Sequence, residues 1–278
     1  MNEVSPPSRS VGLGIDPAVD RVRPVVHARL RQIEQDRGLR VFFACESGSR
    51  AWGFASDDSD FDVRFIFAYE PRSYLQLRPP TDAFDIHGDD EHDLDLAGWD
   101  IRKTAELMRK SNGPLFEWLD SPIVYEQDHK VTPRLIELRD TYFDAKKSVY
   151  HYLSLADGVW RKYLADTDRP VRKKYLYTLR PLACVAYIER HRRQPPTDFL
   201  EVLKGIQLPE TVGLAIDRLV EDKKNNRELG MGDSDPVLND WVSTSLIEGK
   251  EFAEKLTGLT SDTRPLDDLI YQTIMPPE

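Results

Sequence analysis

The sequence has 278 residues, 31% charged and 40% hydrophobic, an ordinary globular balance with room for one large or two modest domains. Its net charge of −10 at pH 7 argues against extensive coating of nucleic acid or binding to a membrane surface, so a polynucleotide partner would need a local basic patch or a metal ion. No apolar run approaches the ~20 residues of a membrane span, and the N-terminal residues lack the apolar core of a signal peptide.

The first half of the sequence alternates helix-like and strand-like segments. Residues 1–16 are rich in Pro, Ser and Gly and are expected to be a mobile N-terminal segment. Apolar residues recur at helical spacing over 17–38, which predicts a helix ending at a glycine. Asp100 is a suitable N-cap for a helix over 101–112. Runs of β-favouring or alternating residues predict extended segments over 39–47, 61–70 and part of 91–100.

The second half has a different character, because strand-like runs are absent after about Tyr142. We therefore predict an α+β protein, with a mixed β-sheet flanked by helices over residues 17–140 and an all-helical domain over 141–278. The tail, from residue 263 onward, is expected to form a docking strand or to be loose. The expected helices of this half are 145–165, 170–193, 197–206, 210–229 and 236–257.

The two cysteines, Cys45 and Cys184, lie far apart in the sequence, each within an apolar run. Such surroundings are typical of buried free thiols rather than of a disulfide or a pair of metal ligands. Together with the missing secretion signal, they predict a reduced, cytoplasmic protein.

Four aspartates crowd into a short stretch before an apolar strand: Asp57, Asp58, Asp60 and Asp62. Residues two apart on a strand share a face, so the last two are expected to project together while Phe61 turns into the core. Neighbouring carboxylates repel unless protons or cations relieve the repulsion, and hard oxygen ligands suit Mg²⁺. The pair therefore indicates either an acidic surface turn or a cation site.

A glycine-serine pair, Gly48-Ser49, lies in the turn that leaves the preceding strand. Glycine lets the backbone approach a phosphate closely, and the Ser hydroxyl and free N–H groups can donate to phosphate oxygens. Ser49 could also act only as a helix cap. A strand, a Gly-Ser turn and a second strand with Asp-x-Asp together predict a site for a nucleoside triphosphate and two metal ions.

These motifs resemble a known signature. GSRAWG…SDDSDFDVRF is similar to that of the nucleotidyltransferase superfamily that includes DNA polymerase β, a Gly-Ser pair followed by Asp-x-Asp between hydrophobic residues. Over residues from about 38 to 260, five segments resemble, in the same order, the RlaP-type family of predicted nucleotidyltransferases, whose name comes from an association with RNA repair. The segments are ACESGSRAWGF, SDFDVRFIF, DLAGWDIRK, SNGPLFEWLDSPIVY and KKYLYTLRPLACVAYIER.

The resemblance implies a nucleotidyltransferase that uses two Mg²⁺ or Mn²⁺ ions. Asp60 and Asp62 would hold the ions, and a third carboxylate from a neighbouring strand would help ligate one of them and orient or deprotonate the attacking hydroxyl. Asp95, between two leucines, matches this element best, with Asp93 as the alternative. The enzyme would transfer NMP from an NTP to a hydroxyl acceptor, such as an RNA end, and release pyrophosphate.

Four further residues are candidate nucleotide ligands, each with a structural alternative. Arg50 either contacts a phosphate or pairs with a nearby acid, and Arg64 either balances the carboxylates or touches substrate. The basic run 169–181 either binds a triphosphate or nucleic acid, or is a solvated helix face. Because superfamily members with a following helical domain often bring a Lys and a Tyr to the nucleotide, the resemblance implies Lys174 and Tyr177.

Two other functions fit the same residues. One is a catalytically silent nucleotide-binding regulator or toxin–antitoxin-like component on the same fold, against which the intact Gly-Ser and Asp-x-Asp motifs count. The other is a metal-dependent hydrolase, which the Gly-Ser element disfavours. No heptad pattern or apolar patch in the sequence indicates an oligomeric state.

Overall fold

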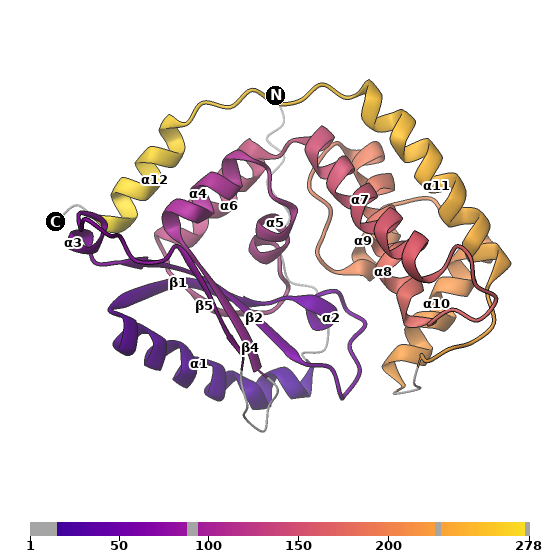
Figure 1. Cartoon of the computed structure of the whole chain (residues 1–278), viewed down its shortest axis with the longest axis horizontal. Helices are drawn as coiled ribbons and strands as arrows, with labels where there is room; N and C mark the ends of the chain where they lie inside the picture. The colour runs from indigo at the N-terminus through magenta and orange to yellow at the C-terminus, as the bar shows by residue number, and fades with distance from the viewer. Residues whose placement is uncertain (1–15, 88–93, 226–228, 276–278) are drawn as a thin grey trace, which may run out of the picture.

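The computed structural model describes residues 16–87, 94–225 and 229–275. Its centre is a five-stranded sheet in the order β3-β4-β2-β1-β5, with helices on both faces (Figure 1). β2 and β4 are parallel and the other neighbours antiparallel, so the sheet is mixed and the α+β prediction is confirmed. The strands are β1 (Leu39–Glu46), β2 (Phe61–Tyr69), β3 (Ala83–His87), β4 (Leu94–Asp100) and β5 (Val124–Gln127).

One face of the sheet is covered by the long helix α1 (Pro17–Arg37) (Figure 1). The Asp16 side chain caps its first turn, and Gly38, with φ of 60°, ends it in the left-handed conformation. Strand β2 turns alternate side chains towards α1, and these are buried in one core with the apolar face of the helix. They are Phe61, Val63, Phe65 and Phe67.

The opposite face carries several shorter helices. As predicted, the Asp100 side chain accepts a hydrogen bond from the N–H of Arg102 and caps α4. Ile66 and Ala68 of β2 are buried in the core on this side. The helices that contribute to this core are α4 (Ile101–Arg109), α5 (Gly113–Leu119), α6 (Val131–Tyr142) and α12 (Arg264–Ile274). Two short helices, α2 (Gly48–Ala51) and α3 (Pro71–Tyr74), follow β1 and β2.

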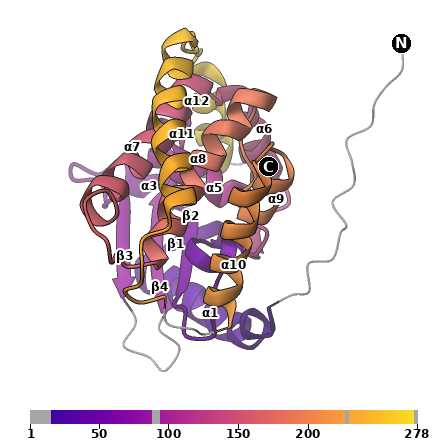
Figure 2. The ribbon, with the colours of Figure 1, turned by 90° about the vertical axis from the view of Figure 1, so that its right-hand side faces the viewer.

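The remaining helices form a core of their own beside the sheet. Figure 2, which faces this part, shows α8, α10 and α11 running side by side. Phe54, from the loop after α2, is buried in this core and meets Phe199 edge-on with ring centroids 6.0 Å apart. The helices are α7 (Ala145–Tyr163), α8 (Lys173–His191), α9 (Phe199–Lys204), α10 (Glu210–Lys224) and α11 (Pro236–Lys255).

The C-terminal tail differs from the sequence prediction. It is the helix α12 rather than a strand or a loose end, and its Leu266 and Leu269 are buried against α4 and α6. A segment this short contains few apolar residues, so their helical spacing is easily overlooked. The helix α12 packs on α4 and α6, which belong to the first half of the chain. The domain boundary between residues 140 and 141 therefore stays a prediction, and it concerns only the chain from α6 to α11.

Other expectations have simpler outcomes. Both cysteines are free and buried, as predicted. Among the described residues, no helix is long and apolar enough to cross a membrane. The expected N-terminal segment, up to residue 15, and the alternative carboxylate Asp93 lie outside the described residues.

Candidate active site

Two aspartates from neighbouring strands stand side by side at one end of the sheet. The parallel register pairs Asp62 of β2 with Asp95 of β4. Both carboxylates are about a third exposed, at 31% and 33%. Since alternate residues of β2 face α1, this pair lies on the opposite face, as the period of two predicts. Burial raises the pKa of Asp62, and the charges of Asp95 and Asp60 add to the effect while Arg64 opposes it.

The glycine-serine turn lies directly against this pair. Gly48 has φ of 59°, and a Cβ built on it would lie 2.0 Å from Oδ2 of Asp62. The N–H of Ser47 donates to the carbonyl of Asp62 at 2.8 Å, which ties the turn to β2. Only glycine meets both demands, a left-handed backbone and contact between backbone and carboxylate. The Gly-Ser element and the Asp-x-Asp element are therefore parts of one site.

Arg64 bridges the two carboxylates. Its Nη2 donates to Oδ1 of Asp62 and to Oδ2 of Asp95, both at 2.8 Å. Its Nη1 donates to the carbonyl oxygens of Asp95 at 2.9 Å and of Val63 at 3.1 Å. The exposed His87 lies with Nδ1 2.9 Å from Oδ1 of Asp95. The arginine thus offsets the repulsion between carboxylates, one of the two roles that the sequence left open for it.

Asp60 does not join the pair to form a ready-made cage of three carboxylates. It is exposed, one residue before β2, and its charge is still felt by Asp62. Within the described ranges, no group of three His, Cys, Asp or Glu side chains is arranged to hold a metal ion. The donor chemistry of Asp62 and Asp95 suits a hard divalent cation, but Arg64 takes up that space in this structure.

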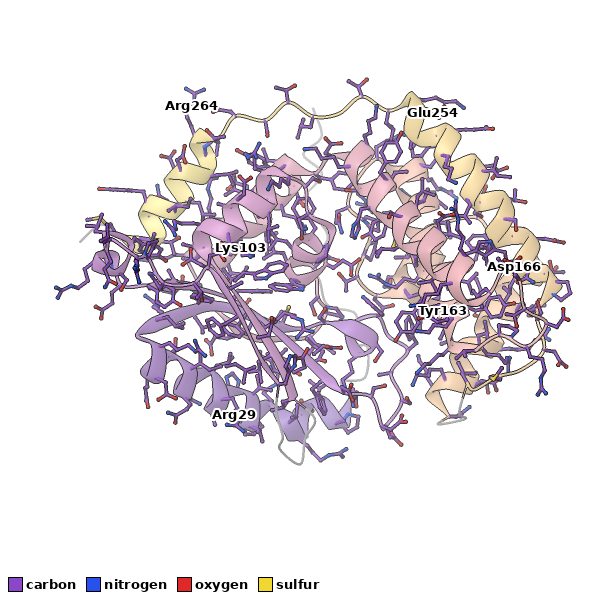
Figure 3. The ribbon with its side chains drawn as sticks, viewed as in Figure 1. Arg29, Lys103, Tyr163, Asp166, Glu254 and Arg264 are labelled. Carbon is purple, nitrogen blue, oxygen red and sulfur yellow. The ribbon has the colours of Figure 1, made fainter. Side chains whose placement is uncertain are left out.

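Helix α8 carries the two residues expected from the helical half, Lys174 and Tyr177, and brings Tyr177 near the carboxylates. Burial raises the pKa of Tyr177, and the charges of Asp62 and Asp60 add to the effect. The Tyr177 ring meets Trp52 edge-on, with centroids 5.9 Å apart. One turn earlier, Nζ of Lys174 lies 4.6 Å from the ring centroid of Tyr163, a residue labelled in Figure 3, and 5.3 Å from that of Tyr177.

The loop before β2 is enclosed by positive side chains. Lys223 of α10 donates to the hydroxyl of Ser56. A hydrogen bond from Ser56 lowers the pKa of Asp58, as do the charges of Lys223 and Lys173. Lysines from α8 and α10 therefore reach the loop that leads to Asp60, where they add positive charge beside the carboxylates.

Arg50 is hydrogen-bonded to the backbone of the loop before β2. Its side chain is 2% exposed, pairs with Asp16 at 2.7 Å and lies 4.0 Å from the Phe61 ring centroid. It also donates to the carbonyls of Ser59 at 2.5 Å and Asp60 at 3.3 Å. Because its nitrogens make these bonds, Arg50 fits the interpretation as the partner of a nearby acid, and we do not propose that it contacts a phosphate.

Two buried glutamates lie beside the site, and the first of them was not predicted from the sequence. Glu46, the last residue of β1, is fully buried, and its carboxylate accepts from the N–H of Asp62 at 2.8 Å and the hydroxyl of Tyr125 at 2.6 Å. Burial raises the pKa of Glu46 to about 7, an effect that these two hydrogen bonds oppose. The only signal in the sequence was an acidic residue at the end of an apolar strand.

The second glutamate, Glu117 of α5, ties the two halves together. It pairs with Arg180 of α8 at 3.0 Å, and it accepts from the Trp52 indole at 3.3 Å and the Tyr152 hydroxyl at 3.0 Å. The guanidinium of Arg180 lies 4.4 Å from the Trp52 ring centroid. The backbone N–H of Trp52 donates to the carbonyl of Gly48. Through Trp52, this cluster therefore anchors the glycine-serine turn to the helical half. The family-like segment that contains Glu117 thus contributes to the packing between the two halves.

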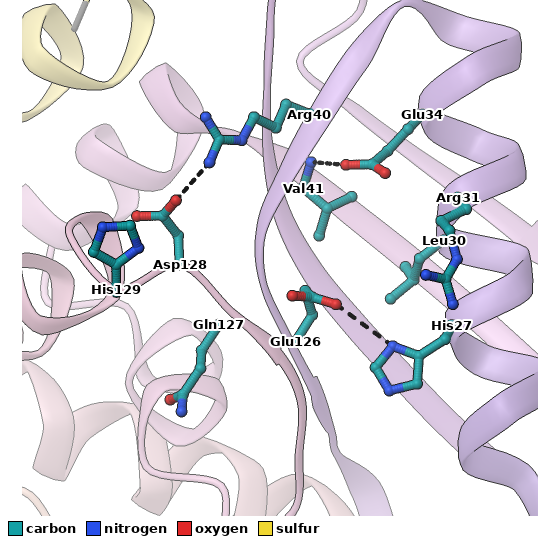
Figure 4. Close-up of a pocket in the computed structure, with 10 residues that line it drawn as sticks. All are labelled: His27, Leu30, Arg31, Glu34, Arg40, Val41, Glu126, Gln127, Asp128 and His129. Carbon is teal, nitrogen blue, oxygen red and sulfur yellow. Dashed lines mark hydrogen bonds and ion pairs between the residues drawn. The ribbon is translucent and has the colours of Figure 1, made fainter.

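Two open cavities lie away from these carboxylates. One, of about 410 Å³, is bounded by α1 and β5 and lined by charged groups, among which His27 lies 3.4 Å from Glu126 (Figure 4). The other, of about 420 Å³, lies between the start of α8 and the loop before α11, lined by Arg172 and Tyr175 among others. Neither cavity is lined by Asp62 or Asp95. The candidate site is therefore the place where the Gly-Ser and Asp-x-Asp motifs meet, and not one of these cavities.

Comparisons with known proteins agree with the motif resemblance. The family model described as RlaP, RNA repair pathway DNA polymerase beta family, matches residues 22–272. The protein YcgL of Bacillus subtilis (strain 168), described as uncharacterized, is 36% identical over 247 residues, which cover 88% of this chain and 94% of that protein. A solved nucleotidyltransferase-like protein from Exiguobacterium sibiricum 255-15 matches with a TM-score of 0.29 and 11% identity, over 82% of this chain and 74% of the other.

Proposed function

This chain belongs to the RlaP family, the RNA repair pathway DNA polymerase beta family, and from that premise we propose that it transfers NMP from an NTP to a hydroxyl acceptor and releases pyrophosphate. The observation that carries the proposal is the meeting of two separate motifs: Gly48 lies against Asp62, and Asp62 is paired in register with Asp95. Both motifs are similar to parts of the nucleotidyltransferase signature, which supports the proposal.

The metal ions of the proposal fit the donor set. Asp60, Asp62 and Asp95 would hold Mg²⁺ or Mn²⁺, and the carboxylate oxygens are the hard ligands that these ions prefer. Two bound ions would supply charge neutralisation and Lewis-acid polarisation at the α-phosphate. In the proposal, Asp95 also orients the acceptor hydroxyl or accepts its proton, and its partly exposed carboxylate is accessible to an acceptor.

The remaining residues have assigned tasks at the triphosphate. The backbone at Gly48 and Ser49 would donate N–H groups to phosphate oxygens, since a glycine permits the close approach. Lys174 and Arg64 would contribute positive charge, and a planar guanidinium can bind a phosphate through two parallel hydrogen bonds. Tyr177 faces Asp62 and Asp60, so its ring would line the same side of the nucleotide.

The acceptor is proposed to be an RNA 3′ end. The lysines beside the loop before β2, Lys173 and Lys223, offer a local positive surface on an acidic chain. A contact of this size would neutralise few phosphates, and binding should weaken with salt by a correspondingly shallow slope. A protein or small-molecule hydroxyl would need no such surface.

The test is transfer of label from each of the four α-³²P-labelled NTPs, with Mg²⁺ or Mn²⁺ and a panel of RNAs. We expect RNA to gain label with stoichiometric release of pyrophosphate, and the Asp62→Asn variant to lose both. Label on the protein itself would identify a protein hydroxyl as the acceptor. Release of free NMP without any acceptor would instead indicate a hydrolase.

One observation favours the catalytically silent alternative. The described residues contain no cluster of three metal-ligating side chains, and Arg64 already bridges Asp62 and Asp95. A silent nucleotide-binding regulator would bind NTP in calorimetry and yet release no pyrophosphate with any acceptor. That pair of results would replace the enzymatic proposal.

A further inference from the structure

Arg64 occupies the position that a cation between the two strands would need. Its Nη2 lies 2.8 Å from a carboxylate oxygen of Asp62 and 2.8 Å from one of Asp95. Of the other two carboxylate oxygens, Oδ2 of Asp62 lies against Gly48, and Oδ1 of Asp95 lies 2.9 Å from Nδ1 of His87. In this arrangement one positive charge of the chain itself already offsets part of the negative charge of the two carboxylates.

A divalent ion and this guanidinium exclude one another. Mg²⁺ binds carboxylate oxygens at about 2.0–2.1 Å, so an ion shared by Asp62 and Asp95 would fall on the atoms of Arg64. Their like charges would also repel at that separation. Binding of the ion therefore requires that the arginine swing away from at least one carboxylate.

The surroundings of Arg64 allow such a movement. Its side chain is 17% exposed and the two carboxylates are about a third exposed. Two other arginines of the region are held more tightly: Arg50, 2% exposed, packs over Phe61, and Arg180, 5% exposed, packs over Trp52. Of these three arginines, Arg64 has the most exposed side chain.

We propose that Arg64 acts as an interlock at this site, which means that divalent metal ions bind there only when a nucleotide is also bound. Without nucleotide, the guanidinium holds Asp62 and Asp95 and keeps divalent ions out. When a nucleoside triphosphate arrives, its phosphates draw the guanidinium away through bidentate hydrogen bonds and free the carboxylates for the ions. The inference rests on the proposed function of the site and adds the order of events: metal and triphosphate load together.

The first test measures Mn²⁺ binding without nucleotide, by the electron paramagnetic resonance signal of free Mn²⁺, on full-length protein. Removing the guanidinium in Arg64→Met is expected to tighten Mn²⁺ binding at least tenfold. Arg64→Lys keeps the positive charge and is expected to stay within about threefold of the wild type, because the competition between charges remains. Adding Asp62→Asn to Arg64→Met should abolish the gained binding.

A second readout follows the arginine itself and needs no activity. In ¹⁵N-arginine-labelled protein, the Nε–H signal of Arg64, assigned by its loss in Arg64→Lys, should shift when Mg²⁺ and a non-hydrolysable ATP analogue are added together. It should shift less with Mg²⁺ alone, since the ion by itself does not draw the guanidinium away. This readout decides the matter if Arg64→Met does not fold.

The outcomes separate the inference from the proposed function. Mn²⁺ binding that depends on Asp62 but does not tighten in folded Arg64→Met overturns the interlock alone. Absence of Asp62-dependent Mn²⁺ binding in every variant overturns both. An Arg64 signal that stays unchanged with Mg²⁺ and the analogue also overturns the interlock.

Discussion

Two arginine–carboxylate clusters, Asp62–Arg64–Asp95 and Glu117–Arg180, differ chiefly in burial. In the Asp62–Arg64–Asp95 cluster the carboxylates are 31% and 33% exposed. In the Glu117–Arg180 cluster the glutamate is 11% and the arginine 5% exposed. The chemistry of the pairs is alike, but one faces water and the other is sealed between the sheet part and the helical part.

The difference in burial assigns the two clusters different tasks. A partly exposed pair can exchange its internal cation for one from solution, because water compensates the separated charges. A buried pair cannot, because removing one partner leaves an uncompensated charge. We therefore assign binding of substrate to the first cluster and the relative position of the two halves to the second.

The largest effect is expected from breaking the buried cluster. Glu117→Ala leaves Arg180 buried without its partner and also removes an acceptor from Trp52 and Tyr152, so the free energy of unfolding should fall by about 3–5 kcal/mol. Urea unfolding measures the loss. Glu106→Ala, which breaks an exposed pair with Arg109, is the matched control and should change stability little. Equal losses in the two variants would contradict the assignment by burial.

Breaking the exposed cluster should separate activity from stability. Asp62→Asn is expected to lower nucleotidyl transfer about 100- to 1,000-fold, the range seen when one preorganised electrostatic group is lost from an active site. Its free energy of unfolding should change by less than about 1 kcal/mol, because the carboxylate is already disfavoured by burial and repulsion. Asp85→Asn, an exposed strand carboxylate paired in register with Ala97, serves as the control and should keep full activity.

Much of the Asp62–Arg64–Asp95 cluster could be predicted from sequence. Asp62 was expected on the face opposite to Phe61 because strand residues alternate, and Asp95 was expected nearby because of its family-like setting, whereas Asp60 precedes β2 and does not join the pair. That Arg64 balances the carboxylates was one of its two predicted roles, but its contact with both at once could not be predicted, since it depends on the register between β2 and β4. Glu46 and the pairing of Glu117 with Arg180 could not be predicted because burial of a charged residue arises only from tertiary packing.

The fold follows the same rule. Long apolar runs such as β1 and β2, and the amphipathic helices of the second half, were predicted close to their observed bounds. The edge strands β3 and β5 were missed because they are short and largely accessible, so they lack a clear apolar pattern. The packing of α12 on α4 joins distant parts of the chain, which no local pattern reveals.

Glu46 sharpens the comparison, because it is a buried carboxylate whose direct partners are a hydroxyl and an N–H rather than an arginine. Its pKa rises from 4.5 to about 7 on folding, so the native state binds a proton more tightly than the unfolded chain. The associated stability is present below pH 4.5 and is lost as the pH rises through 7, on the order of 3 kcal/mol in all.

Glu46→Gln should remove this dependence on pH. Urea unfolding at several values between pH 4 and pH 8 would compare the variant with the wild type. We expect the wild type to lose stability relative to the variant as the pH rises. A difference that stays constant over this range would show that folding does not raise the pKa of Glu46.

The smallest effect is expected at the turn that supports the exposed cluster. Gly48→Ala would bring a Cβ against Asp62 and strain a residue with φ of 59°, so we expect a loss of about 1–3 kcal/mol in unfolding free energy. Gly213→Ala, where a Cβ meets nothing within 4 Å, is the matched control and should be neutral or slightly stabilising. A neutral Gly48→Ala would show that the turn does not lie against the carboxylate.

The most direct test of the account is anomalous diffraction from crystals grown with Mn²⁺ and a non-hydrolysable NTP. We expect Mn²⁺ peaks within bonding distance of the Asp62 and Asp95 carboxylates, the triphosphate against Gly48 and Ser49, and Arg64 turned from the carboxylates to the phosphates. Metal and nucleotide bound elsewhere, for example in the cavity between α1 and β5, with the bridge of Arg64 intact, would contradict it.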